Sequence, residues 1–290
     1  MATSAGLGPL IRLRNLSPSS LPSHPSLKDA NDTSIISFAA SALAEANIFM
    51  TGYAPANFDV KSIEKHSAPA TAAVELSAKD IPASALPKDS GVPSEVTENW
   101  FARKSTHDNK AEKGTGTWEE FDFALRVDHS QHEKDYTPDV LDAHEVLNWD
   151  EQLESSGRRV EGGWEDVHAG VYEMCHKIPP PLNNRVFSVL VITGKKEKEF
   201  LVVQIPVGTQ GLPGVKYRDD SKVTAGIYCS IERGELLEEG SKVVWQMATA
   251  SDAKGVLPMW AQKMGVPGAV VKDVGLVVGW LDEQRGKGKV

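Results

Sequence analysis

The sequence contains few of the residues from which disulfide frameworks and metal sites are built. It has two cysteines in 290 residues, Cys175 and Cys229, and both fall inside segments with a strand pattern. No secretory signal pattern precedes them, so we expect two free, buried thiols in a reducing compartment and a cytoplasmic location. Cys175 and His176 are adjacent, but a metal site needs a larger cluster of ligands. We therefore expect neither a metal nor another cofactor.

Positive charge is also scarce. Lys and Arg total 31 against 40 Asp and Glu, which gives a net charge of −9 at pH 7. Such a balance repels phosphate backbones, and no basic stretch with interleaved aromatic residues overrides it, so we expect no nucleic-acid partner. We favour ordinary solubility as the reason for the acidity.

No uninterrupted apolar run is long enough to predict a membrane-spanning helix. The longest apolar stretch, residues 255–281, is broken by Lys263, Pro267, Lys272 and Asp273. Hydrophobic residues nevertheless make up 40% of the chain, which is enough for a large core. The first 28 residues contain Arg12 and Arg14 and no acid, as in transit peptides, but their prolines and glycines argue against an amphipathic targeting helix.

The chain divides by composition into three parts. Residues 1–32 are a polar, proline-punctuated lead-in, and a helix follows an N-cap at Asp32-Thr33, with Ile36, Ala40, Leu43 and Ile48 near one side. Residues 54–98 are rich in Ala, Pro and Ser, so we interpret 33–98 as this helix followed by a long surface excursion. Residues 99–285 form the main domain.

The main domain has mostly strand patterns and ends in one long helix. Alternation predicts a strand at "TWEEFDFALRV", helical spacing predicts a helix at "TPDVLDAHEVLNWDEQL", and turn signals bound five further strands. Short connections between strands require antiparallel pairing. The last helix is predicted over 257–284, so the fold class is α+β: a curved antiparallel sheet around a C-terminal helix. The five strands are predicted at 167–177, 186–194, 199–206, 223–233 and 242–251.

This order of elements resembles the START (steroidogenic acute regulatory protein-related lipid transfer) superfamily. The residues that carry the likeness are "WFARKSTH", "GTWEEFD", Arg185 with Phe187 in "PPPLNNRVFSVLV", and above all "MATASDAKGVLPMWAQKMGVPGAVVKDVG". More closely, residues 99–284 and "GPLIRL" resemble a fungal domain-of-unknown-function family assigned to that superfamily. The resemblance implies a helix-grip fold whose sheet and last helix enclose an apolar cavity. It implies a class of ligand and no particular reaction.

The resemblance also indicates which side chains line the cavity. Where sterol-carrying members place a buried basic residue and an acid, this chain has Val191 and Tyr172, so we expect a drier cavity with Tyr172 as its main polar group. Arg185 either binds a ligand headgroup or closes the proline-rich turn. The full predicted lining is Phe121, Phe123, Tyr172, Met174, His176, Arg185, Phe187, Val189, Val191, Trp245, Met247, Trp260, Met264 and Val271.

Three functions remain open at this stage. The first is binding or transfer of a lipid or other apolar small molecule, with transient membrane contact and no stable protein partner. The second is a cyclase- or hydrolase-type enzyme acting on a polyketide or similar apolar intermediate, with Tyr172 or His176 as acid or base. His168 and His176 share a strand face with Tyr172, but no nucleophile lies at triad spacing, and we favour the interpretation of both as rim histidines bonded to the backbone. The third is an interaction module that binds a partner through residues 54–98.

Glycines form a strip along the predicted last helix. Gly268, Gly275 and Gly279 fall on adjacent positions of the helical wheel. Each glycine weakens a helix by about 1 kcal/mol relative to alanine, so a strip of three requires a reason. Either the helix backbone approaches the sheet closely, or the strip leaves room for a ligand.

Overall fold

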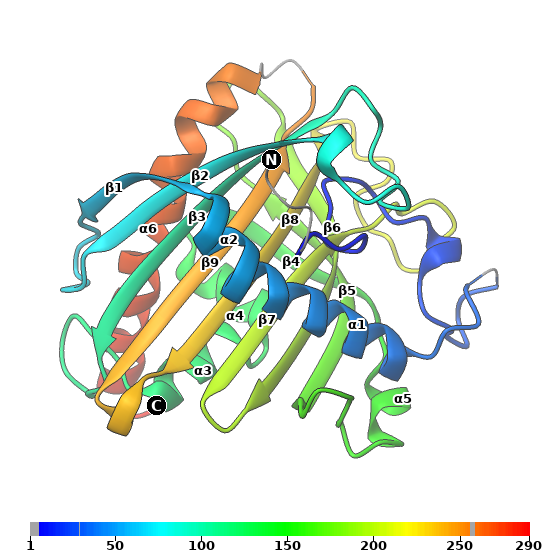
Figure 1. The fold of residues 1–290 in the computed structure, drawn as a ribbon. Coiled ribbons are helices and arrows are strands. Elements are labelled where there is room, and N and C mark those ends of the chain that lie inside the picture. Colours follow the sequence, from blue (N-terminus) through cyan, green and yellow to red (C-terminus); the bar gives the residue numbers. More distant parts are fainter. Residues whose placement is uncertain (1–5, 29, 256–258) are drawn as a thin grey trace.

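A single nine-stranded sheet organises the part of the chain that the structure describes. The structure is a computed structural model that describes residues 6–28, 30–255 and 259–290, with side chains at 238 and 259–261 left aside. The strand order is β1-β2-β3-β9-β8-β7-β6-β5-β4 (Figure 1). The strands are β1 (Asp59–Lys65), β2 (Val74–Pro82), β3 (Thr97–Asp108), β4 (Val140–Asn148), β5 (Glu165–His176), β6 (Asn184–Lys196), β7 (Glu199–Pro206), β8 (Val223–Leu236) and β9 (Lys242–Asp252).

Neighbouring strands in this order pair antiparallel, as the short connections require. In addition, the first residues of β6 and β8 pair parallel, from Asn184 opposite Val223 to Phe187 opposite Gly226. All five predicted strands are confirmed, each within three residues of its expected ends. The α+β helix-grip architecture is therefore the observed one.

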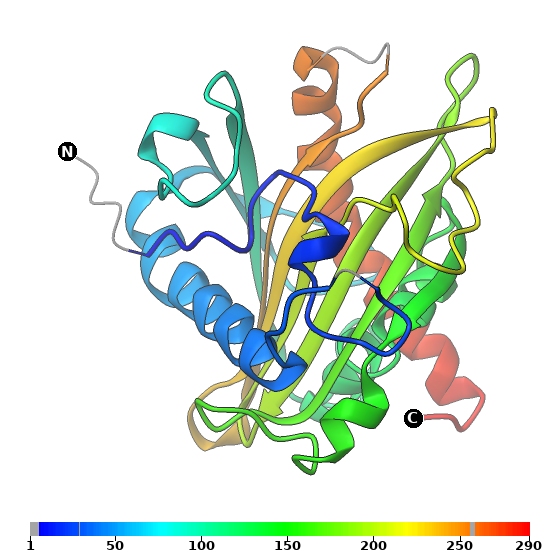
Figure 2. The same ribbon diagram turned by 90° about the vertical axis from the view of Figure 1, so that its right-hand side faces the viewer.

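Helices cover both faces of the sheet. The segment before the first helix and α1 lie on one face, and α6 lies on the other together with α3 and α4 (Figures 1 and 2). Successive strand residues point to opposite faces, so β6 sends Leu190 and Ile192 toward α1, and Val189 and Val191 toward the α4 side. The helices are α1 (Ile35–Ile48), α2 (Ala54–Asn57), α3 (Trp118–Leu125), α4 (His129–Tyr136), α5 (Asp150–Glu154) and α6 (Met259–Gly286).

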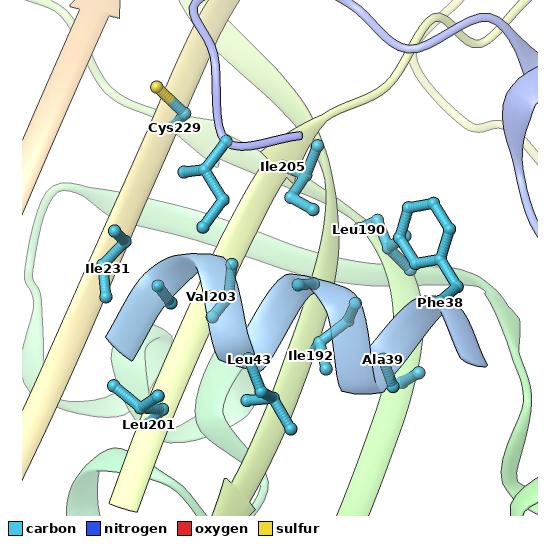
Figure 3. Close-up of a cluster of buried hydrophobic side chains, with 14 of the residues drawn as sticks. Phe38, Ala39, Leu43, Leu190, Ile192, Leu201, Val203, Ile205, Cys229 and Ile231 are labelled. Atoms are coloured by element: carbon cyan, nitrogen blue, oxygen red, sulfur yellow. The ribbon is translucent and has the colours of Figure 1, made fainter. Parts of the chain in front are cut away.

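The larger hydrophobic cluster lies between α1 and the sheet. Figure 3 shows Phe38, Ala39 and Leu43 of α1 directed at the inner strands, where Ile192 and Val203 are fully buried. The helix begins one residue later than predicted, at an N-cap Ser34 whose side chain accepts a hydrogen bond from the Ser37 N–H. The predicted face was partly wrong: Leu43 is buried, but Ile48 is 53% exposed.

The N-terminal segment is tied to the sheet by a buried ion pair. Arg12 Nη1 donates to Glu98 Oε2 at 2.8 Å, and neither side chain has exposed surface. The Leu13 backbone N–H donates to Glu98 Oε1 at 2.6 Å, and Trp100 Nε1 donates to Glu98 Oε2 at 2.8 Å. Buried charges are tolerated when they are paired and hydrogen-bonded in this way. Leu16 extends the connection through a bridge to Val207.

Residues 54–98 do not form a surface excursion. They contain β1 and β2, and β2 pairs with β3 over nine consecutive residue pairs, from Val74 opposite Ser105 to Pro82 opposite Thr97. Val74 and Leu76 are buried against α6 and β9. The Ala- and Ser-rich composition concealed β2, whose partner strand β3 begins 15 residues after β2 ends.

Two predicted elements of the main domain were of the wrong type. The segment "TWEEFDFALRV" forms α3, because Thr117 and Glu120 make a capping box and Phe121, Ala124 and Leu125 are buried at helical spacing. The segment "TPDVLDAHEVLNWDEQL" forms the edge strand β4 followed by the short α5, because pairing with β5 outweighs its local helical spacing.

Within the described residues, two helical runs are long and apolar enough to cross a membrane by length and composition alone. They are Ile35–Asn57 and Gln262–Gly286, and about half of each window is buried inside the protein. Both pack on the sheet in this structure, as core helices of soluble proteins also do.

Candidate functional site

A cavity of about 410 Å³ lies between the sheet and α6. Its floor is formed by inward-facing residues of β3, β5, β6, β7, β8 and β9, its side by α4, and its cover by the first two thirds of α6. The volume falls within the range of small-molecule sites in proteins. The antiparallel sheet curves around α6, so the alternating inward side chains of six strands face one space.

The walls of the cavity are mostly apolar. Met174 of β5, Phe187 of β6 and Met247 of β9 line it from the sheet, and Val266 and Val270 line it from α6. Methionine and aromatic side chains adapt to irregular apolar shapes, which suits a ligand cavity.

The cavity also contains a buried cation. Arg103 Nη2 lies 3.6 Å from Glu232 Oε2, and the guanidinium carbon lies 3.8 Å above the Trp245 ring. Trp245 Nε1 donates to the same Glu232 oxygen at 2.8 Å. All three side chains are less than a tenth exposed. The ion pair and the ring face together compensate the cost of burying the charge.

Two further carboxyl groups line the cavity from helices. Burial and the nearby charges of Glu232 and Asp273 together raise the pKa of Glu133 on α4 to about 8. Burial also raises the pKa of Asp273 on α6 to about 6, although the Arg103 charge opposes this shift. At neutral pH, Glu133 is therefore mostly protonated and Asp273 mostly ionised.

A buried histidine holds the α4 side of the cavity in place. His129 Nδ1 lies 2.6 Å from the Leu125 carbonyl oxygen, and its Nε2 lies 3.0 Å from Gln204 Nε2. Burial lowers the pKa of His129, so the ring is neutral, with Nδ1–H donating to Leu125 and Nε2 accepting from Gln204. This bond positions Gln204, which lines the cavity beside Glu133.

Five of the predicted lining residues do line this cavity: Met174, His176, Phe187, Trp245 and Met247. His176 packs edge-on against Phe187 with ring centroids 5.3 Å apart, and burial lowers its pKa to about 4. The ring is therefore neutral across the physiological range.

Tyr172 and Val191 line a second, more polar pocket of about 290 Å³. The Tyr172 hydroxyl donates to Glu145 Oε2 at 2.8 Å. Val189 is fully buried in the cluster between the two pockets. The expectation of a drier cavity with Tyr172 as its main polar group was wrong, because β3, β7 and β8 bring polar residues into the main cavity. His168 belongs to the second pocket, where Asp150 and Asp166 flank it.

The other predicted residues lie elsewhere. Phe121 is buried against His107 and Trp245, and Phe123 stacks on Trp280 at a centroid distance of 5.9 Å. Val271 packs beside the core clusters under α6, and Met264 is 75% exposed on its outer side. The side chain of Trp260 lies outside the described residues.

Arg185 closes a turn and does not face the cavity. Its Nε donates to the Ala253 carbonyl at 2.6 Å, Nη1 donates to the Asn183 carbonyl, and Nη2 donates to the Lys254 carbonyl at 3.4 Å. These bonds join the start of β6 to the chain that leaves β9. Of the two alternatives for this residue, the structure places it in the turn.

The polar residues of the cavity were missed at the sequence level. They include Arg103, Glu133, Gln204, Glu232 and Asp273, together with Asp139, Lys177, Lys272 and the hydroxyl groups of Tyr136 and Tyr228. A signal existed for Glu232, because in "YCSIERGE" it alternates with Cys229 and Ile231, both fully buried on the other face. Glu133 and Asp273 carried no such signal, since no helix was predicted at α4 and the last helix was interpreted only from its apolar spacing. Among the described residues, no group of three potential ligands could hold a metal ion.

Comparison with solved structures shows the same fold. Human STARD10 is 13% identical with a TM-score of 0.54, and the match covers 92% of this chain and 85% of that one. Human StAR-related lipid transfer protein 5 is also 13% identical with a TM-score of 0.54, and the match covers 84% of this chain and 98% of that one. At this identity the likeness establishes architecture and not activity.

Sequence comparison gives a family whose activity is not known. No curated protein matches this sequence. A family model matches residues 100–281, which include every strand from β4 to β9, most of β3 and most of α6. Because the match spans more than half of the chain, the protein belongs to the family described as "Protein of unknown function (DUF3074)".

Proposed function

We propose that the protein binds, and passes on, a lipid or another hydrophobic small molecule in the cavity between the sheet and α6. The observation that carries this proposal is the cavity itself: about 410 Å³, with Met174, Phe187, Met247, Val266 and Val270 on its walls. Burial of apolar ligand surface against such walls contributes about 25 cal/mol per Å² before the costs of association. The name of one structural neighbour, human StAR-related lipid transfer protein 5, agrees with this function.

An enzyme of the cyclase or hydrolase type is supported less well. The two residues expected to act there as acid or base, Tyr172 and His176, line different pockets. Acid–base chemistry in the main cavity would instead have to use Arg103 and Glu232, whose charges are buried and paired with each other.

Transient membrane contact belongs to the same proposal. Met264 is 75% exposed and lies on α6 beside Gly265 and Val266, which line the cavity. An apolar side chain at the entrance of a lipid cavity offers a surface for brief contact with a bilayer.

A matched pair of variants tests the binding proposal. We expect Val266→Trp to weaken or abolish ligand retention, by at least about tenfold in affinity, because the indole occupies cavity space. Met264→Trp places the same ring two residues earlier on the exposed side and should retain ligand as the wild type does. Native mass spectrometry and lipid extraction of the three purified proteins provide the comparison. Equal ligand content in all three, or none in the wild type after exposure to lipid extracts, would argue against the cavity as the site.

A further inference from the structure

The second pocket is separate from the main cavity. It lies between α4 and strands β4, β5 and β6, and the two spaces share no lining residue among those described. The wall between them contains Val189, which is fully buried. It also contains the hydrogen bond between His129, which lines the second pocket, and Gln204, which lines the main cavity. The second pocket can therefore hold a ligand of its own.

Two buried hydroxyl groups of this pocket lack hydrogen-bond partners. Ser130 Oγ on α4 and Thr193 Oγ1 on β6 have no partner among the described residues, and the two residues are only 3% and 4% exposed. A buried hydroxyl without a partner costs folding free energy. Both residues line the pocket, so a bound molecule would supply the missing partners.

Carboxylates predominate among the charged groups of the pocket. Arg126 is the one lysine or arginine among its described lining residues, which include four acids. These acids are Asp128, Glu145, Asp150 and Asp166. Burial raises the pKa of the Tyr172 hydroxyl above its ordinary value, and so do the charges of three of these acids, all but Asp166. Their negative potentials therefore overlap inside the pocket.

Two cations balance the acids at one end of the pocket. Arg126 donates to Asp122 and, at 2.8 Å, to Asp166 Oδ2. Lys195 Nζ lies 3.8 Å from Asp122 and 3.9 Å from Asp166. These four charges compensate one another, so Arg126 is not available to attract a ligand anion.

The other acids keep an excess of negative charge. Arg158 is shared by Asp150, at 2.9 Å, and Glu154, at 2.8 Å. Neither Glu145 nor Asp128 forms an ion pair with any described residue, and Glu145 accepts hydrogen bonds from uncharged side chains. The pocket and the residues ion-paired with it thus hold six carboxylates against three cations.

His168 is held by hydrogen bonds and does not offset this excess. Arg158 Nη1 donates to His168 Nδ1 at 2.8 Å, so this ring nitrogen accepts. The other ring nitrogen, Nε2, is left to donate to Asp166 Oδ1 at 3.3 Å. An imidazole with one donor and one acceptor nitrogen is neutral.

The charge and the unpartnered hydroxyl groups together select the class of ligand. An anion would be repelled by the carboxylates, and a neutral polyol would leave their charge uncompensated. A metal ion needs a compact set of ligands, and no group of three potential ligands occurs among the described residues. An ammonium group donates three hydrogen bonds and accepts none, which matches both carboxylate and hydroxyl oxygens.

We propose that the second pocket is a binding site for a small aliphatic amine, whose ammonium group donates to the pocket carboxylates and to the hydroxyl oxygens of Ser130 and Thr193. Its volume of about 290 Å³ lies just below the usual range for drug-sized ligands. Asp150, Asp166 and His168 are partly exposed, so the pocket opens to solvent. The site is independent of the lipid proposed for the main cavity.

Three four-carbon probes test the charge preference: 1,4-diaminobutane, 1,4-butanediol and succinate have cationic, neutral and anionic ends. Amide NMR at pH 7 and physiological ionic strength, which screens exposed charges, follows each titration. We expect saturable shifts at Ser130, Gly170 and Thr193 with the diamine, at least about tenfold weaker binding of the diol, and no binding of succinate. Diol or succinate binding as tight as that of the diamine would overturn the assignment of a cation. Absence of saturable shifts at these residues with all three probes would overturn the site.

A matched pair of variants separates this pocket from general attraction to an acidic protein. Glu145→Gln keeps an acceptor for the Tyr172 hydroxyl but removes one charge, so affinity for 1,4-diaminobutane should fall at least about fivefold. Glu64→Gln makes the same change on the exposed edge strand β1, and affinity should fall less than about twofold. Equal losses in the two variants would mean that the diamine responds to overall charge, which would contradict the proposal.

Two further variants test the hydroxyl contact and the location. Thr193→Val removes a hydroxyl that has no partner in the free protein, so the melting temperature without amine should not fall, while affinity for 1,4-diaminobutane should fall at least about threefold. A lower melting temperature with unchanged affinity would show that Thr193 serves the fold and not a ligand. Val266→Trp, which fills the main cavity, should bind the diamine as the wild type does. Loss of diamine binding in Val266→Trp would place the amine in the main cavity and overturn the assignment.

Discussion

Replacing Gly275 with alanine should lower the free energy of unfolding by about 1–3 kcal/mol, the range for overpacking a close contact. A Cβ at this position would lie 2.4 Å from the Ala68 carbonyl oxygen and 2.7 Å from the Ser67 carbonyl oxygen. Both are backbone atoms, so neither can rotate away. The Gly275 N–H also donates to Ser67 Oγ at 2.9 Å, and that hydroxyl donates in turn to the Lys272 carbonyl at 3.0 Å. The residues before β2 thus hold α6 in position over the cavity.

Gly268 is the matched control on the same helix. No atom lies within 4 Å of a Cβ built there, so Gly268→Ala should stabilise the protein by up to about 1 kcal/mol through helix propensity. Urea unfolding followed by circular dichroism measures both variants against the wild type. A neutral Gly275→Ala would mean that α6 does not rest on residues 67–68 as described. Within the glycine strip, the close approach of another backbone therefore requires glycine at position 275. The approaching backbone belongs to the loop before β2 and not to the sheet.

The second large effect is a pH dependence of stability that originates at Glu133. Its pKa is raised to about 8 in the folded protein, so the folded state holds this proton more firmly than the unfolded state does. The stabilisation that comes from the firmer binding of this proton is present in full at low pH, and it is lost as the pH rises toward 8. Between pH 6.5 and pH 8, one group of this kind accounts for about 2 kcal/mol, at about 1.4 kcal/mol per pH unit.

Other titrating groups act mainly below this window. The pKa of Asp273 is raised to about 6, and the pKa values of His107 and His176 are lowered to about 4. The titratable groups that interact with Glu133 are His129 and Tyr136 on α4, Tyr228 and Glu232 on β8, and Asp273 on α6.

Glutamine at position 133 should remove this part of the pH dependence. We expect the wild type to lose about 2 kcal/mol relative to Glu133→Gln between pH 6.5 and pH 8, as measured by urea unfolding at both pH values. Glu64→Gln on the exposed edge strand β1 should parallel the wild type. Parallel behaviour of Glu133→Gln as well would show that Glu133 is ionised in the folded protein at neutral pH.

The sequence predicted the elements that depend on local pattern. The five strands from β5 to β9 and the final helix were found because apolar alternation, turn residues and helical spacing are encoded within each segment. β2 was missed because its stability comes from pairing with β3 and from packing of Val74 and Leu76 under α6. α3 was predicted as a strand although its capping box, Thr117 with Glu120, was visible in the sequence.

Several apolar residues of the candidate site were predicted from the sequence, but its charged residues were not. The apolar members Met174, Phe187 and Met247 could be named before the structure was known, because the resemblance to the START superfamily indicated which strand residues face inward. The polar members come from separate elements: Arg103 from β3, Glu133 from α4 and Asp273 from α6. Each is unremarkable in its own segment, and only the curvature of the sheet and the position of α6 bring them together.

The methionines provide the most direct test of a ligand cavity between the sheet and α6. Met174 and Met247 line the cavity, Met50 is buried in the cluster on the opposite face of the sheet, and Met264 is exposed. Methyl NMR of the protein labelled at its methionines, recorded during addition of dodecanol, reports on all four positions. The account predicts saturable shifts of the Met174 and Met247 signals with little change at Met50 and Met264. Shifts confined to Met50 or Met264, or no saturable shift at any of the four, would contradict it.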